Sequence, residues 1–169
     1  MNVLAKVYTI AGPWKGRLSI IPRPRGGEWL QDEMEALREE GIDIVVSLLT
    51  TGEVQELELA DEAALARTKG LQFLHYPIPD YSVPSSLPET RAFIEKLDEA
   101  LTRGENVGIH CRQGIGRSAT IASLLLLWWK VPPEEALNRV ATARGCSVPD
   151  TDEQREWIGK FARYLNASS

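Results

Sequence analysis

Apolar and polar residues follow two different periodicities along the chain. Residues 42–49, IDIVVSLL, are apolar and β-branched almost throughout, which is typical of a strand buried on both faces of a parallel sheet. In residues 29–40, by contrast, Leu30, Met34 and Leu37 recur at the spacing of one helical face. The pattern therefore predicts that strands and helices are both present.

Turn and capping signals place the remaining elements. Besides residues 42–49, strands are predicted at 4–10, 17–21, 71–76 and 106–110. Helices are predicted at 29–40, from Thr50 to about Gly70, after Ser86, at 118–130, after Pro132 and after Asp150, with capping boxes at Thr50 with Glu53, Ser86 with Glu89 and Asp150 with Glu153. Strands that alternate with helices predict an α/β fold, with one domain over residues 1–169 and a central, mostly parallel sheet flanked by helices.

This topology predicts where a ligand would bind. The strands that end before Pro77 and Cys111 are joined through one helix, and a right-handed crossover makes two such strands parallel. Ligands of parallel sheets bind outside the carboxyl ends of the strands. We therefore expect Asp80, in the proline-rich segment after the first of these strands, to lie close to Cys111.

Composition narrows the function classes. Of the 169 residues 43% are hydrophobic and 25% are charged, as in ordinary globular proteins. A net charge of −5 argues against a nucleic-acid partner or an anionic membrane surface. The first twelve residues lack the apolar core of a signal peptide, and the apolar stretch 119–129 is shorter than the about 20 residues that span a bilayer. We expect no membrane insertion and, with two cysteines, a reducing cytoplasm.

One nine-residue segment concentrates the candidate chemistry. Residues 110–118 read HCRQGIGRS, between an apolar strand and an apolar helix. A glycine-containing loop between a strand and a helix points backbone N–H groups at an anion. Gly114 and Gly116 let the backbone curl, and Arg117 adds a planar fork that binds two phosphate oxygens. The segment predicts a phosphate-binding loop.

Cys111 stands at the start of this loop and is the candidate nucleophile. Helix N-termini and cationic neighbours lower a thiol pKa from about 8.5 to about 3.5–7.5. A helix dipole contributes at most about 2 kcal/mol, whereas a three-unit shift corresponds to about 4 kcal/mol. Loop amides, the Ser118 hydroxyl and Arg117 are therefore needed to stabilise the thiolate.

The segment matches the HCxxGxGR(S/T) signature of the cysteine-dependent protein tyrosine and dual-specificity phosphatases at all nine positions, and the chain resembles that family. The chain length and residues 77–84, PIPDYSVP, resemble its compact, dual-specificity branch. Ile78-Pro79-Asp80 stands where the classical tyrosine-specific enzymes carry Trp-Pro-Asp.

The resemblance implies a two-step reaction. Cys111 attacks phosphorus, Asp80 protonates the leaving oxygen, and water then hydrolyses the phosphocysteine while Ser118 stabilises the departing thiolate. His110 orients the loop. The phosphate-binding residues that it implies are Arg112, Gln113, Gly114, Ile115, Gly116 and Arg117. Arginine and amides neutralise the phosphate charge, so we expect no metal and no cofactor.

Several substrates and rival functions stay open at this stage. The expected partner is a phosphorylated protein, with phosphotyrosine first and phosphoserine or phosphothreonine second, or a small phosphomonoester such as a phosphoinositide headgroup. The rivals are a rhodanese-like sulfurtransferase, an arsenate reductase and a phosphate-binding module without turnover. Four residues have no settled role: Arg23 and Arg25 as further phosphate or acidic-substrate contacts, Gln154 as a residue that positions water, and Cys146 as a redox partner of Cys111.

Overall fold

The computed structural model describes residues 5–168, so Leu4, the predicted start of the first strand, lies outside the described residues. The strands are β1 (Tyr8–Ile10), β2 (Leu18–Ile20), β3 (Ile44–Ser47), β4 (Gln72–His75) and β5 (Val107–His110). A 3-10 turn, η1 (Gly27–Trp29), precedes α1 (Leu30–Glu39), and the later helices are α2 (Thr51–Glu56), α3 (Glu62–Thr68), α4 (Leu87–Thr102), α5 (Arg117–Trp128), α6 (Pro133–Arg144) and α7 (Asp152–Ala167).

One five-stranded sheet of order β1-β2-β5-β3-β4 forms the centre of the molecule. β1 runs antiparallel to β2, whereas the pairs β2–β5, β5–β3 and β3–β4 are parallel. All four residues of β3 are buried, because this strand lies inside the sheet and both of its faces are covered. The mostly parallel α/β sheet that the periodicities predict is confirmed.

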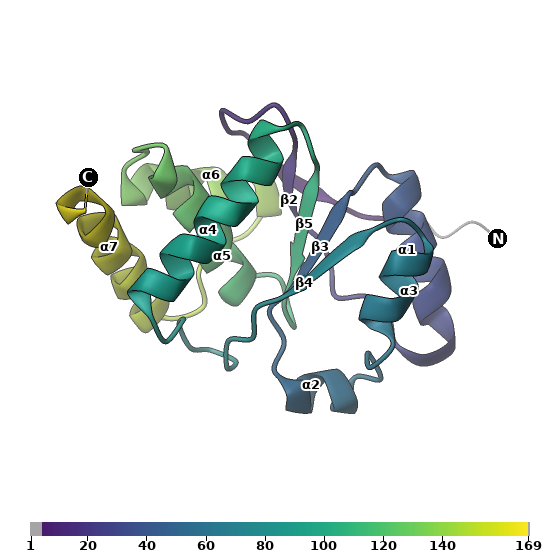
Figure 1. Ribbon diagram of the computed structural model, residues 1–169. Helices are drawn as coiled ribbons and strands as arrows, with labels where there is room; N and C mark the ends of the chain where they lie inside the picture. The colour runs from purple at the N-terminus through teal and green to yellow at the C-terminus, as the bar shows by residue number, and fades with distance from the viewer. Residues whose placement is uncertain (1–4, 169) are drawn as a thin grey trace.

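Helices cover both faces of the sheet (Figure 1), with α1 and α3 on one side and α4 to α7 on the other. Each side has its own apolar cluster: Met34 and Ala66 belong to the first, and Ile94, Leu125 and Phe161 to the second. α5 packs against α4, α6 and α7, which explains why this helix is apolar on every face. Within residues 5–168 no helix is both long and apolar enough to cross a bilayer.

The helix predicted from Thr50 to about Gly70 is in fact two helices. The capping box of Thr50 and Glu53 is present at the start of α2, but α2 ends at Glu56 and α3 begins at Glu62. Glu58 has a φ of 58°, and the N–H of Leu59 donates to the Val54 carbonyl at 2.8 Å, which closes α2. Leu59 is thereby buried in the apolar cluster beside α1 and α3, and its burial outweighs the local helical pattern.

Two other capping predictions need correction. At α7 the box consists of Thr151 and Gln154, one residue later than predicted, because the Thr151 hydroxyl accepts from the Gln154 N–H at 3.1 Å. At α4 the Ser86 hydroxyl accepts from the Glu89 N–H at 3.2 Å, which is the first half of a box only. Both helices begin close to where the sequence places them.

Candidate active site

Residues 111–116, here called the cradle loop, connect β5 to α5 and curl around the Cys111 side chain. The N–H of Gly114 donates to the Cys111 Sγ at 3.2 Å, and Cys111 is only 3% exposed. Gly114 has a φ of +73°, a left-handed conformation that glycine adopts without strain. The loop therefore turns the Gly114 amide towards the thiol.

Arg117, the first residue of α5, is a guanidinium held in one orientation while only 1% exposed. Its Nη1 donates to Glu53 Oε1 at 2.7 Å and to the Ile78 carbonyl at 2.8 Å, and its Nη2 donates to Glu53 Oε2 at 2.9 Å. Among the described residues nothing accepts from its buried Nε. Because buried donors are normally satisfied, this Nε–H is the donor that a phosphate oxygen would take.

Glu53 provides the countercharge for Arg117 from the first turn of α2. Burial raises the pKa of Glu53, but hydrogen bonds from Arg117 and from the Thr50 backbone outweigh it and lower this pKa from 4.5 to about 2. The pKa of Arg117 is raised in turn: burial opposes the charge, and Glu53, Cys111 and Asp80 favour it. The pair is ionised throughout the physiological pH range.

Asp80 lies in residues 77–86, here called the acid loop, which follows β4. Its Oδ1 is 3.1 Å from Arg117 Nη2 and accepts from the Tyr81 N–H at 3.0 Å, while its side chain is 36% exposed. β4 and β5 both pair in parallel with β3, so the acid loop and the cradle loop leave the same edge of the sheet. Asp80 therefore contacts Arg117, the residue that follows the cradle loop, and its approach to Cys111 itself stays a prediction.

The His110 side chain is held by a buried carboxylate of α3, that of Glu62. Its Nε2 donates to Glu62 Oε2 at 2.6 Å, and both side chains are almost fully buried. Its backbone carbonyl accepts from the Leu48 N–H at 3.0 Å. The residue before Cys111 is thus held through both its side chain and its backbone.

Ser118 is buried in the first turn of α5, and its Oγ has no hydrogen-bond partner among the described residues. A buried hydroxyl without a partner is uncommon in folded proteins. Its position one residue after Arg117 leaves this hydroxyl available to a group bound in the cradle loop.

The variable residues of the cradle loop face acids and arginines at its outer side. Arg112 is 3.1 Å from Glu56 Oε1 and 3.7 Å from Glu53 Oε2. The carbonyls of Gln113 and Gly114 each accept from the Arg144 guanidinium at 3.2 Å. Ile115 packs against the apolar core. Of the predicted binding residues, Arg112 and Gln113 therefore lie at the rim of the loop and Ile115 anchors it.

Gly116, the N-cap of α5, lies against a third carboxylate. A Cβ atom added at Gly116 would be 2.3 Å from Asp150 Oδ2. Burial and then the charge of Asp80 raise the pKa of Asp150, against the opposing effect of Arg117. Asp80, Asp150 and Arg117 therefore form one electrostatically coupled group.

Gln154 is buried and does not point into open space. Its Oε1 accepts from the N–H groups of Asp150 at 3.0 Å and Thr151 at 3.2 Å, and its Nε2 donates to the Ser82 carbonyl at 3.2 Å. The side chain thus connects the start of α7 to the acid loop. The water-positioning role considered from the sequence stays a prediction.

Three acidic residues of the site were not identified from the sequence: Glu53 as the partner of Arg117, Glu62 and Asp150. For Glu53 a signal existed, since it follows β3, whose carboxyl end lies at the same sheet edge as those of β4 and β5. Glu62 and Asp150 carry no comparable local signal. Residues 5–168 contain no group of three or more His, Cys, Asp and Glu side chains placed to hold a metal ion.

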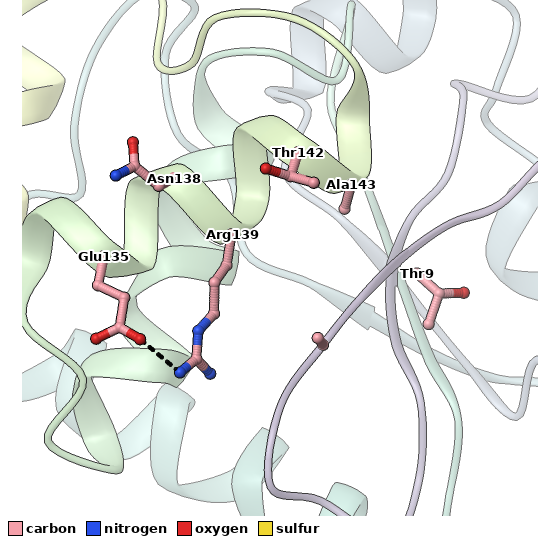
Figure 2. Close-up of a pocket in the computed structure, with 7 residues that line it drawn as sticks. Thr9, Glu135, Asn138, Arg139, Thr142 and Ala143 are labelled. Carbon is pink, nitrogen blue, oxygen red and sulfur yellow. Dashed lines mark hydrogen bonds and ion pairs between the residues drawn. The ribbon is translucent and has the colours of Figure 1, made fainter.

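A separate pocket of about 290 Å³ lies between the β1 end and α6 (Figure 2) and shares no residue with the cradle loop. Its rim carries an ion pair in which Arg139 donates to Glu135 at 2.8 Å. None of the predicted site residues lines it, so the candidate site is confined to the sheet edge described above.

Comparison with known proteins agrees with the geometry. The family model described as "Tc-R-P: Polymorphic toxin system, DSP-PTPase phosphatase" matches residues 21–130. Cyclin-dependent kinase inhibitor 3 of Rattus norvegicus is 29% identical over 140 residues, which cover 82% of this chain and 66% of the relative. Putative tyrosine phosphatase 197R of Invertebrate iridescent virus 6 is 31% identical over 155 residues, or 89% of this chain and 54% of the relative. The chain thus spans about two thirds of the rat relative and about half of the viral one.

Solved structures share the fold over nearly the whole chain. Kinase associated phosphatase (KAP), crystallised with its catalytic-site cysteine replaced by serine, superposes with a TM-score of 0.89 at 22% identity, covering 99% of both chains. Tk-PTP in its active form gives a TM-score of 0.75 at 27% identity, covering 96% of this chain and 99% of that one. The family match spans more than half of the sequence and includes the cradle loop, and this chain belongs to the DSP-PTPase phosphatase family.

Proposed function

We propose that this chain is a cysteine-dependent phosphatase that hydrolyses phosphomonoesters, with phosphotyrosine in proteins as its first substrate and phosphoserine or phosphothreonine as its second. The observation that carries the proposal is Arg117, a buried guanidinium fixed by Glu53 directly after the loop that encloses Cys111, whose Nε has no partner within residues 5–168. An immobilised arginine fork beside a thiol binds a phosphoryl group where the sulfur can attack it.

In the first step the Cys111 thiolate forms a bond to phosphorus, and the bond from phosphorus to the leaving oxygen breaks. The Arg117 Nε–H and the cradle-loop amides stabilise the phosphoryl oxygens. Asp80 gives its proton to the leaving oxygen. Bound phosphate would compete with Asp80 for Arg117 Nη2, which would free the carboxyl to face the leaving oxygen.

In the second step water attacks the phosphocysteine, and the bond from sulfur to phosphorus breaks. The Asp80 carboxylate, having lost its proton, takes one from the water. The Ser118 hydroxyl donates to the departing thiolate, a role supported by its burial without another partner in the described part of the chain. Glu62 and His110 hold the first residue of this machinery in register.

The surroundings of Asp80 support an aryl substrate. Tyr81 is 55% exposed beside the acid, and its φ of 59° places its backbone in the left-handed region at a small conformational cost. An exposed ring at the entrance suits contact with the ring of phosphotyrosine.

The family match does not favour the alternative functions of a sulfurtransferase, an arsenate reductase or a phosphate-binding module without turnover. We also propose that residues 1–169 act as one phosphatase domain in the cytoplasm, since both cysteines are free.

The test is hydrolysis of p-nitrophenyl phosphate against pH, with chelator present, for the parent, Cys111→Ser, Asp80→Asn and Cys146→Ser. We expect Cys111→Ser to reduce the rate to background, because serine is not ionised at neutral pH. Asp80→Asn should lower kcat by about 10²- to 10⁴-fold, the usual contribution of a general acid, and should flatten the alkaline limb of the profile.

Cys146→Ser is the matched control, since Cys146 lies outside the cradle loop, and it should keep the parent profile. An inactive parent, or a Cys111→Ser variant as active as the parent, contradicts the proposed function.

A further inference from the structure

Arg144, the last residue of α6, reaches across to the backbone of the cradle loop. Its Nη2 donates to the Gln113 carbonyl at 3.2 Å, and its Nε donates to the Gly114 carbonyl at 3.2 Å. Gly145 follows in the left-handed conformation and ends the helix. One guanidinium therefore binds two consecutive carbonyls of the loop, and we call these two hydrogen bonds the carbonyl clamp.

The carbonyl clamp sets the directions of the two N–H groups that follow these carbonyls. A trans peptide unit is planar, and its C=O and N–H point in opposite directions. The Gln113 carbonyl faces Arg144, so the N–H of Gly114 points the other way, where it donates to the Cys111 Sγ at 3.2 Å. By the same geometry, the bond from Arg144 to the Gly114 carbonyl turns the N–H of Ile115 away from the guanidinium.

The acceptors of Arg144 are backbone carbonyls and not acidic side chains. Within residues 5–168 no carboxylate lies within ion-pair distance of Arg144, whereas Arg112 pairs with Glu56 at 3.1 Å. Arg25 likewise pairs with Glu33. A guanidinium donates two hydrogen bonds in fixed directions, but a lysine ammonium is a point charge. The carbonyl clamp therefore depends on the shape of arginine as well as on its charge.

Arg144 is itself held by its surroundings. Its guanidinium carbon lies 4.3 Å from the centre of the Tyr8 ring on β1, and a Cβ atom added at Gly114 would be 3.5 Å from its Nε. α6 packs against β1 and against α5, the helix that begins with Arg117. Contact with a ring face and with the loop backbone restricts the guanidinium to one orientation.

We propose that Arg144 is a positioning residue of the phosphatase reaction: through the carbonyl clamp it aims the N–H groups of Gly114 and Ile115 at the phosphoryl oxygens. The inference rests on the proposed function and adds to it a residue of α6. N–H donors that are oriented in advance stabilise the charge of the transition state without reorganisation. Tyr8 supports the clamp by holding Arg144.

The first test measures oxyanion binding without turnover. Tungstate, a tetrahedral dianion, is titrated by calorimetry into Cys111→Ser protein and into the same protein with Arg144→Lys or Arg139→Lys. Arg144→Lys keeps the charge but loses the fork, and it should bind tungstate at least about tenfold more weakly, because two N–H donors are no longer aligned. Arg139 lies in the same helix and pairs with Glu135 at 2.8 Å, so Arg139→Lys is the matched control and should preserve the affinity.

A second pair of variants tests the support from Tyr8. In the Cys111→Ser background, Tyr8→Phe keeps the ring and Tyr8→Leu removes it. Tyr8→Phe should preserve the affinity for tungstate, and Tyr8→Leu should reduce it by about two- to fivefold, as expected for the loss of one cation–π contact.

Turnover then separates positioning from substrate contact. With Cys111 intact, Arg144→Lys should lower kcat for p-nitrophenyl phosphate at least about tenfold and change KM less, because aligned amides stabilise the transition state more than the bound substrate. The circular dichroism spectrum should remain that of the parent. Arg139→Lys should keep both kinetic constants.

The proposal fails if Arg144→Lys binds tungstate as tightly as the Cys111→Ser protein, since charge alone would then suffice, or if Arg139→Lys weakens binding as much. It also fails if Arg144→Lys raises KM and leaves kcat unchanged, which would show a direct substrate contact. Tungstate binding with the expected dependence on Arg144, in a protein whose parent releases no phosphate, contradicts the proposed function and leaves the carbonyl clamp supported.

Discussion

Arg117 is a charge that the fold buries completely, and Glu53 is the residue that makes this possible. Removing one partner of a buried ion pair leaves the other charge without compensation, which usually costs more than the pair itself contributes. Asp80 cannot replace Glu53, because it is about one-third exposed and is itself the proposed general acid. The stability of the site therefore depends on the buried pair of Arg117 and Glu53.

Glu53→Gln isolates this contribution, because glutamine also satisfies a capping box. We expect the variant to lose about 3 kcal/mol of unfolding free energy at neutral pH. The pKa of Glu53 is about 2 in the folded protein against 4.5 ordinarily, so its stabilisation is complete above pH 4.5 and is lost as pH falls from there to about 2. The difference between parent and variant in urea unfolding should shrink over the same range.

Glu56→Gln is the control for this measurement. Glu56 lies in the same helix but pairs with Arg112 at the surface, so its replacement should change the unfolding free energy by less than about 1 kcal/mol. A parent-minus-Glu53→Gln difference that does not change between pH 7 and pH 3 would contradict the assignment.

Glu53 also shows which residue roles the sequence could and could not predict. Its capping box with Thr50 is visible because the two residues are three positions apart. Its bond to Arg117 spans 64 positions and follows only once the order of the strands is known. Cys111, Arg117 and Ser118 were predicted because they stand in one contiguous nine-residue segment, and Asp80 was predicted because it follows a neighbouring parallel strand.

At the scale of elements, α7 holds the acid loop through Gln154. The Nε2 of Gln154 donates to the Ser82 carbonyl at 3.2 Å, and the N–H of Ser82 donates to the Pro79 carbonyl at 3.0 Å, which closes the turn around Asp80. The position of the general acid therefore depends on a helix that begins about seventy residues later in the chain.

Gln154→Ala and Thr151→Ala separate this contact from simple helix capping. Both remove part of the same capping box, and each should cost about 1 kcal/mol of stability. Only Gln154→Ala removes the bond to the acid loop. It should lower kcat more for phenyl phosphate, whose leaving group needs a proton, than for p-nitrophenyl phosphate. Equal leaving-group dependence in both variants would show that Gln154 acts only as a cap.

The elements that the sequence placed wrongly have physical explanations. Local pattern favours one helix from Thr50 to Gly70, but burial of Leu59 breaks it into α2 and α3. Asp150 is a good capping residue, yet Thr151 takes the cap and the Asp150 carboxylate lies against Gly116 instead. In both cases a tertiary contact overrides a local preference, and such contacts are not visible in the spacing of residues.

At the scale of the whole molecule, the strand order brings the site together. β3 lies between β4 and β5, so Glu53, Asp80 and Cys111 follow three adjacent parallel strands and meet at one edge. The alternation of elements predicted this α/β sheet and the meeting of two of the loops. It could not predict that β3 lies between the other two strands, and so the contribution of the loop after β3 was missed.

The electrostatic design is also a property of the whole chain. A net charge of −5 gives the chain no general attraction for anions. The arginines near the cradle loop provide positive charge only locally, at this edge of the sheet. We therefore expect the chain to select its substrate through contacts at the site rather than by long-range electrostatic steering.

The most direct test of the central claim is the capture of the phosphocysteine. Ser118→Ala should slow hydrolysis of the intermediate more than its formation, so rapid acid quenching during turnover of p-nitrophenyl phosphate should accumulate it. Mass spectrometry of the peptide that contains Cys111 should then show one added phosphoryl group, and Cys111→Ser should show none under the same conditions. Phosphoryl transfer to another residue, or a burst of nitrophenol without any phosphorylated peptide, would contradict a mechanism through Cys111.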